Sequence, residues 1–218
     1  MFPLKDNIPS KTFPFVTYLI VFLNILIFIQ ELTLATGLDT FVEKYALIPA
    51  NVNFNNYYSL YPFLTSAFLH GGWLHILGNM WFLIVFGDNV EDKFGHFKFL
   101  LFYLAAAFIA AFAQYTAGPA SATPIIGASG AIAGVLGSYI LLFPRSKILT
   151  LVFIVIFVTL IEVPAYIVLG FWFILQLLNG LYSLDTTITE SLIAYWAHIA
   201  GFLFGLVISI YYKAISKK

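Results

Sequence analysis

The chain has 218 residues, of which 61% are hydrophobic and only 9% are charged, and its ten Lys and Arg residues balance ten Asp and Glu residues. A soluble domain of this size carries roughly a quarter charged residues, so a water-exposed globular protein is close to excluded. The zero net charge argues against nucleic acid as a partner, and the lack of cysteine excludes disulfides and thiolate chemistry. The charge deficit runs from end to end, which predicts one membrane-embedded domain, residues 1–218.

Several apolar runs are long enough to cross a membrane, which takes about 20 residues of helix for a hydrocarbon layer of about 30 Å. The sequence predicts an all-α, polytopic membrane protein. Its six transmembrane helices lie at about residues 13–30, 73–90, 97–116, 129–143, 164–182 and 193–212. The first two spans are joined by a long outer loop, about residues 32–72. A loop this long without structure would be unusual, so we expect it to lie partly in the outer leaflet.

The apolar stretch at residues 148–182 is too long for one span at about 1.5 Å per residue of helix. Pro164 disfavours helix at the preceding residue and removes a backbone donor, so the stretch divides there. The second piece is long enough to cross. The first piece, residues 148–161, would cover only about 21 Å as a helix, and we interpret it as interfacial or re-entrant.

The basic residues test this span count. Only Lys44 lies on the outer side of a six-span topology, and the other nine share the opposite side: Lys5, Lys11, Lys93, Lys98, Arg145, Lys147, Lys213, Lys217 and Lys218. This positive-inside pattern predicts a multi-pass protein of the cell membrane with both termini in the cytoplasm. A seventh span at residues 148–161 would put the basic C-terminal tail outside, so six is the better count.

Polar side chains inside spans are costly and are therefore functional candidates. His75 and Asn79 lie four residues apart in the second span and share one helical face. Ser129 opens the fourth span, His198 falls in the first third of the sixth, and His70 lies at or just above the membrane surface. In a six-span topology the four intramembrane groups come from three helices and share the outer half of the membrane. We therefore expect one site.

A serine within hydrogen-bond reach of a histidine is the minimal activated nucleophile, because neutral imidazole takes the hydroxyl proton as the oxygen attacks a carbonyl. This chemistry fits Ser129 and His198. The backbone N–H of Ser129, the Asn79 amide and the His75 ring can donate to the negative oxygen of the intermediate. We find no acidic residue at the right depth for a third member, so the sequence predicts a dyad.

Small residues recur four apart beside these groups, a spacing that lets helix backbones approach closely. Gly127 and Gly130 flank the serine and permit a tight turn and close approach of a substrate. The four-residue repeats are Gly130 and Gly134, Ala133 and Gly137, and Ala197, Gly201 and Gly205. They predict tight packing of the fourth span against the sixth, beside the reacting groups.

Together, three motifs resemble the rhomboid family of intramembrane serine proteases in type, order and spacing. The first is His70-x4-His75-x3-Asn79. The others are Gly127-Ala128-Ser129-Gly130 and Ala197-His198-x2-Gly201-x3-Gly205. The resemblance implies a six-helix core without metal or cofactor, and hydrolysis of peptide bonds in or near transmembrane segments of substrate proteins in the lipid bilayer.

By this resemblance Ser129 would be the nucleophile and His198 the general base. His75, Asn79 and the Ser129 amide would form the oxyanion hole, and His70 would support the site from the loop. Span five and the following outer loop would gate lateral substrate entry, which implies Phe171, Trp172 and residues 183–192. Some family members carry a Tyr four residues after the serine, where this chain has Ala133, so the sequence does not identify what orients His198.

Two other readings stay open. A non-catalytic rhomboid-like protein that binds transmembrane clients would be expected to lose Ser129 or His198, and both are present. A transporter or channel is disfavoured because the polar residues do not line a path across the bilayer.

We interpret the remaining intramembrane amides as helix-packing residues: Asn24, Gln114, Gln176 and Asn179. Glu162, beside Pro164, is expected to cap or pair locally.

Overall fold

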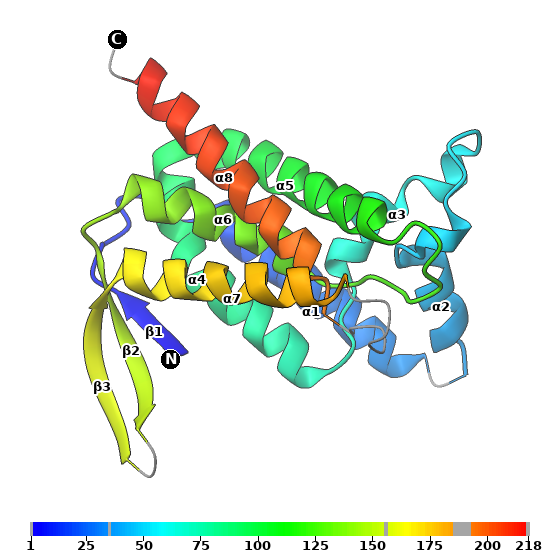
Figure 1. Ribbon diagram of the computed structural model, residues 1–218, viewed down its shortest axis with the longest axis horizontal. Coiled ribbons are helices and arrows are strands. Elements are labelled where there is room, and N and C mark those ends of the chain that lie inside the picture. The colour runs from blue at the N-terminus through cyan, green and yellow to red at the C-terminus, as the bar shows by residue number, and fades with distance from the viewer. Residues whose placement is uncertain (1, 35, 155–156, 185–192, 217–218) are drawn as a thin grey trace.

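The computed structural model describes residues 2–34, 36–154, 157–184 and 193–216, which form one helical bundle (Figure 1). Its long helices are α1 (Phe15–Thr33), α4 (Trp73–Phe94), α5 (His96–Ala117), α6 (Ser129–Leu142), α7 (Ala165–Tyr182) and α8 (Tyr195–Ile215). Their bounds differ from those predicted by at most four residues, at the end of α4. The expected all-α polytopic bundle is confirmed, with a small sheet added at one end.

The lengths of these helices fit a membrane-embedded protein. α1, α5, α7 and α8 are long and apolar enough to span a bilayer, and α4 joins them if it is counted with the bent segment 57–68 that precedes it. α6 is apolar but has only 14 residues. At about 1.5 Å per residue it covers about 21 Å. The count of six spans therefore stays a prediction.

The central helix of the bundle is α6, in which every residue from 130 to 139 is buried. It packs most extensively against α8, and also against α4, α5 and α7. A Cβ atom on Gly201 would collide with the carbonyl oxygen of Gly130, and one on Gly205 with that of Gly134. The two backbones are therefore in direct contact, as the small-residue spacing predicts.

The segment between α1 and α4 is folded. It contains α2 (Leu38–Tyr45), η1 (Pro49–Asn51), η2 (Tyr57–Ser59), α3 (Pro62–Thr65) and η3 (Ser66–Phe68). The Tyr61 hydroxyl donates to the Lys44 carbonyl at 2.7 Å, and the Thr65 hydroxyl to the Tyr45 carbonyl at 2.8 Å. These elements gather at one end of the bundle, here called the loop end, and both chain ends lie near the other, the terminal end (Figure 1).

Residues 148–154 and 157–161 are strands and not helix, and an interfacial or re-entrant position of this segment stays a prediction. They belong to an antiparallel hairpin of β2 (Lys147–Ile154) and β3 (Phe157–Pro164), and β1 (Phe2–Asp6) pairs with β2 to give the order β1-β2-β3. The helical interpretation was wrong because the segment is dense in β-branched residues, which favour strands, and short apolar runs do not distinguish the two structures. The hairpin projects from the terminal end (Figure 1).

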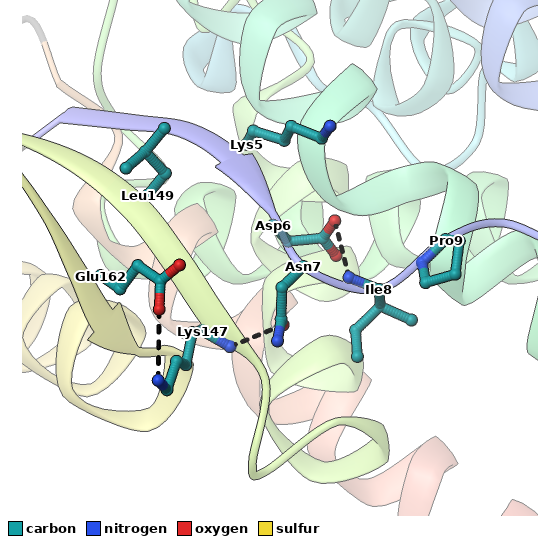
Figure 2. Close-up of a pocket in the computed structure, with 8 residues that line it drawn as sticks. All are labelled: Lys5, Asp6, Asn7, Ile8, Pro9, Lys147, Leu149 and Glu162. Atoms are coloured by element: carbon teal, nitrogen blue, oxygen red, sulfur yellow. Dashed lines mark hydrogen bonds and ion pairs between the residues drawn. The ribbon is translucent and has the colours of Figure 1, made fainter.

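A hollow of about 360 Å³ lies where β1 passes the base of this hairpin (Figure 2). On its wall the Lys147 ammonium pairs with the Glu162 carboxylate at 3.2 Å, so Glu162 does pair locally. The backbone N–H of Lys147 donates to the Asn7 side chain at 2.8 Å. Asp6, also on the wall, accepts from the Tyr139 hydroxyl of α6 and from the Asn89 amide of α4. The N-terminal strand is thereby tied to two core helices.

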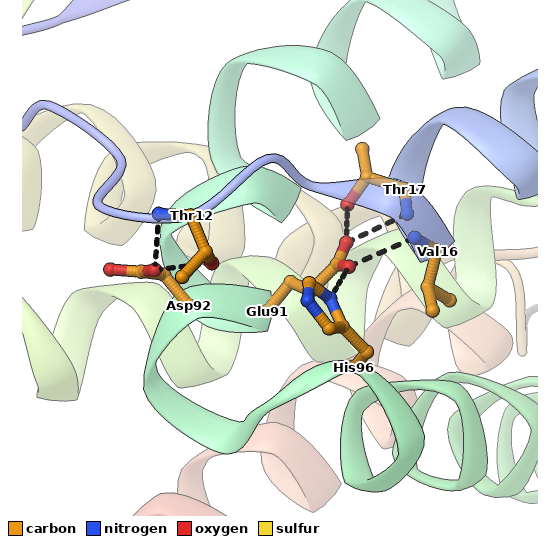
Figure 3. Close-up of polar contacts among 6 residues, drawn as sticks. All are labelled: Thr12, Val16, Thr17, Glu91, Asp92 and His96. Atoms are coloured by element: carbon orange, nitrogen blue, oxygen red, sulfur yellow. Dashed lines mark hydrogen bonds and ion pairs between the residues drawn. The ribbon is translucent and has the colours of Figure 1, made fainter.

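A fully buried carboxylate, Glu91, holds the start of α1 against the end of α4 (Figure 3). It accepts from the backbone N–H groups of Val16 at 2.9 Å and Thr17 at 2.7 Å, and from the Thr17 hydroxyl. Its other contact is the His96 ring at 2.5 Å. First-turn N–H groups have no partner within their own helix, so Glu91 acts as an N-terminal cap supplied by another helix.

Candidate active site

Ser129 is the first residue of α6, and the loop before it is fixed from two sides. Ile125 and Leu47 exchange backbone hydrogen bonds at 2.8 and 3.2 Å, and the Gly127 N–H donates to the Ser66 carbonyl at 2.9 Å. Gly127 has a backbone φ angle of +113°, a conformation that residues other than glycine rarely adopt. The folded segment between α1 and α4 thus sets where the serine lies.

His198 lies in the first turn of α8 and is 9% exposed. Its Nε2 atom lies 2.7 Å from the Ser129 hydroxyl oxygen. The Gln114 side chain of α5 accepts from the backbone N–H groups of Trp196 and Ala197, which caps the start of α8 just before the histidine. The structure therefore brings together the two residues expected to form the dyad.

The other ring nitrogen of His198 has a partner that the sequence reasoning missed. Its Nδ1 atom lies 2.8 Å from the side-chain oxygen of Gln176 on α7, a residue that its sequence position alone marks only as a packing residue. The ring of Trp172, one turn earlier on α7, lies 5.8 Å from the imidazole between centroids. The available signal was the four-residue spacing of Trp172 and Gln176, which places both on one helical face.

His75 and Asn79 converge on the loop before the serine. A Cβ atom on Gly127 would lie 2.6 Å from His75 Nε2 and 3.6 Å from Asn79 Nδ2, so both groups face this glycine, two residues from Ser129. The Gly71 N–H donates to His75 Nδ1 at 3.4 Å. That contact leaves the proton of a neutral ring on Nε2, and His75 can then donate toward the site.

His70 supports this arrangement from the segment before α4. It is buried, its Nε2 atom lies 3.0 Å from Asn79 Nδ2, and its ring packs edge-on against that of His75 at 5.0 Å between centroids. The buried carboxylate of Glu31, near the end of α1, accepts from the His70 backbone N–H at 3.2 and 3.3 Å. Sequence reasoning missed Glu31, whose signal was a lone acidic residue at the end of an apolar run.

The expected gate residues differ in their environment. Trp172 faces His198 and Phe202, whereas Phe171 is 49% exposed on the outer surface of α7. The expected gating loop falls mostly on residues 185–192, which lie outside the described residues. The structure does not test a gating role for any of them.

Little open space adjoins the serine. A cavity of about 20 Å³ is lined by Ser129, Ser66 and Gly127, together with Ile125 and Ile126 of the preceding loop and alanines of α5 and α8. That volume holds about one water molecule. Within the described part of the chain, no three His, Asp or Glu side chains are grouped to hold a metal ion.

The fold and the site define a class: a polytopic helical membrane protein in which a buried histidine contacts a partly buried serine. The Rhomboid domain family model matches residues 57–215, well over half of the chain, and the chain belongs to this family. The matched region contains α4 to α8 and every residue of the candidate site except Glu31 and Leu47.

Curated relatives carry the same family description. The chain is 36% identical over 81 residues to Rhomboid-like protein 11, chloroplastic, of Arabidopsis thaliana, covering 37% of this chain and 29% of that protein. It is 29% identical over 153 residues to the human Presenilin-associated rhomboid-like protein, mitochondrial (66% and 36%). It is 33% identical over 117 residues to yeast Rhomboid protein 1, mitochondrial (52% and 33%). The matches span about a third of these relatives' own length.

Proposed function

We propose that this protein is an intramembrane serine endopeptidase that hydrolyses peptide bonds in or near transmembrane segments of membrane-protein substrates. The observation that carries the proposal is the 2.7 Å contact between Ser129 Oγ and His198 Nε2 in a chain of the Rhomboid domain family. A hydroxyl at this distance can pass its proton to the imidazole while its oxygen attacks a carbonyl carbon.

The reaction runs in two halves. Ser129 Oγ attacks the scissile carbonyl as its proton moves to His198 Nε2. The tetrahedral intermediate then expels the amine, which takes that proton, and an acyl-serine remains. Water attacks the acyl-serine with His198 again as base. The proton returns to Ser129 Oγ as the second intermediate breaks down, and the carboxylic acid product leaves.

Each tetrahedral intermediate carries a negative oxygen that needs hydrogen-bond donors. The His75 Nε2–H and the Asn79 amide, which both face Gly127, supply two. The backbone N–H of Ser129, at the start of α6, supplies a third with the favourable end of the helix dipole. All three belong to the folded protein before substrate binds, so little reorganisation is needed in the transition state.

The rival function is that of a non-catalytic relative that binds transmembrane clients without cutting them. A fluorophosphonate probe separates the two because it reacts with an activated serine and needs no substrate. We expect labelling of the purified protein and fragments from a single-span test substrate. Both should disappear in Ser129→Ala and in His198→Ala, but not in Ser216→Ala, whose serine lies at the exposed end of the chain. Labelling or cleavage that survives in Ser129→Ala would overturn the proposal.

The proposed location is a cell membrane, with both termini in the cytoplasm and the site opening toward the outer side. The pattern of basic residues supports this orientation. The relatives named for mitochondria and chloroplasts make an organelle membrane the competing location. Because the chain has no cysteine, single-cysteine variants report sidedness directly. An impermeant maleimide should label Tyr57→Cys in intact cells and leave Ser216→Cys unlabelled, and the reverse pattern would contradict the orientation.

A further inference from the structure

The proposed base makes side-chain hydrogen bonds through both of its ring nitrogens. His198 Nε2 faces Ser129, and His198 Nδ1 faces the side-chain oxygen of Gln176 at 2.8 Å. No Asp or Glu side chain in the described ranges is hydrogen-bonded to this imidazole. The position opposite Nδ1, which an aspartate occupies in soluble serine peptidases, is held here by a neutral amide.

This contact has a consequence for the proton on the ring. A neutral imidazole carries one N–H, and an amide oxygen can only accept. The Gln176 oxygen therefore favours the tautomer with hydrogen on Nδ1, which leaves the Nε2 lone pair free to take the proton from Ser129. In the other tautomer Nε2 would be a donor and could not act as a base.

The contact also fixes the orientation of the ring. Trp172, one turn before Gln176, packs on the imidazole and on Phe202, and Phe173 stacks on Phe202 at 4.5 Å between centroids. The imidazole is thus held by a ring contact and by a hydrogen bond, both from α7. Ala133 of α6 lies four residues after Ser129, where some family members carry a tyrosine. Alanine has no ring that could orient His198.

We propose that Gln176 is the positioning residue for His198, giving a Ser129–His198–Gln176 relay in which the third member is uncharged. The inference rests on the proposed peptidase function. An uncharged partner is suited to an apolar surrounding, where an unpaired carboxylate would be costly. It fixes the tautomer and the ring, but it stabilises the transient imidazolium less than a carboxylate does.

Substitution of Gln176 tests the proposal. Gln176→Leu keeps the side-chain volume but removes the acceptor, so we expect kcat to fall about tenfold to a hundredfold with KM little changed. Gln176→Glu keeps an oxygen that can accept from His198 Nδ1 whether the new carboxyl group is protonated or ionised. This variant should therefore recover most of the kcat that Gln176→Leu loses. The rate of fluorophosphonate labelling should follow the same order, because it reports on the serine without substrate entry.

The matched control is Asn179→Leu. Asn179 lies on the same helix, and among the described residues its amide donates only to the Leu175 carbonyl of α7 itself, at 2.7 Å. We expect Asn179→Leu to retain the wild-type kcat. If Gln176→Leu and Asn179→Leu keep the same kcat, or if Gln176→Glu is no better than Gln176→Leu, the positioning role is wrong.

A spectroscopic measurement tests the tautomer without any activity. In protein labelled with nitrogen-15 at histidine, the His198 signals can be assigned as those lost in His198→Ala. We expect the Nδ1–H tautomer in the wild type and a mixture in Gln176→Leu, and identical spectra in the two would overturn the inference. Loss of activity in Gln176→Leu with full activity in Ser129→Ala would instead refute the proposed function.

Discussion

The Ser129 hydroxyl and the His198 imidazole lie 2.7 Å apart although 69 positions separate them in the chain. They meet because α6 and α8 cross with their backbones in contact: Gly201, one turn after the histidine, lies directly against the carbonyl of Gly130, the residue after the serine. The serine–histidine pair therefore lies beside a direct backbone contact between the two helices.

The first prediction concerns this crossing. Gly201→Ala puts a methyl group into the Gly130 carbonyl, which is backbone and cannot turn aside, so we expect stability to fall by about 1–3 kcal/mol. Gly170→Ala is the control, because no atom of another described element lies within 4 Å of its Cβ position in α7, and alanine is the better helix former by up to about 1 kcal/mol. Thermal unfolding in detergent should move the two midpoints in opposite directions. Equal midpoints would contradict the packing argument.

The second prediction concerns the proposed oxyanion donors. Asn79→Leu removes an amide that faces Gly127 and leaves a similar volume, so we expect kcat to fall by about 10² to 10³ with little change in KM. Asn24→Leu provides the comparison: this buried asparagine donates to the Ile20 carbonyl of its own helix and should leave kcat unchanged. Steady-state cleavage of a single-span substrate measures both. A rise in KM with kcat unchanged would mean that Asn79 acts in substrate binding instead.

The third prediction concerns the cap at the start of α1. Glu91→Gln replaces the charged acceptor of two backbone N–H groups, and hydrogen bonds to charged groups contribute about 1.5–3 kcal/mol, so the unfolding midpoint should drop clearly. The neighbouring Asp92 accepts from Lys11 and Thr12 at the exposed surface. Asp92→Asn should cost no more than about 0.5 kcal/mol. Equal losses in the two variants would show that burial of the carboxylate is not what matters.

The fourth prediction concerns pH and Asp6, which lies outside the spans. Burial raises the pKa of the Asp6 carboxyl above its usual range, although the Tyr139 hydroxyl opposes this by hydrogen bonding to the anion. The folded state therefore holds this proton to a higher pH than the unfolded chain, whose pKa is about 3.9. Between these two pKa values, the contribution of Asp6 to stability falls as pH rises.

Asp6→Asn removes this titration. We expect the wild type to gain stability relative to Asp6→Asn as pH is lowered from neutral toward about 4, measured as the difference in unfolding midpoint. A difference between wild type and Asp6→Asn that stays constant across this range would rule out the pH linkage.

Much of the helical fold could be predicted because each span carries its own signal. Apolar length placed α4 to α8 to within a few residues, and the four-residue spacing of His75 and Asn79 placed both on one face. The hairpin could not be placed this way, because residues 148–161 are apolar throughout and show no period that separates a strand from a helix. Its pairing with β1 joins residues almost 150 positions apart, which no local pattern encodes.

The sequence by itself determined that the protein lives in a membrane, and it singled out Ser129, His198, His75 and Asn79, because a polar group in an apolar span is costly enough to be conspicuous. Only the tertiary structure decided which partners these groups have. Gln176 looked like any amide on a lipid-facing helix until the packing of α7 against α8 set its oxygen 2.8 Å from His198. Hydrogen bonds between helices depend on how each helix is rotated about its own axis and on the angle at which two helices cross. Both are defined only by the packed bundle.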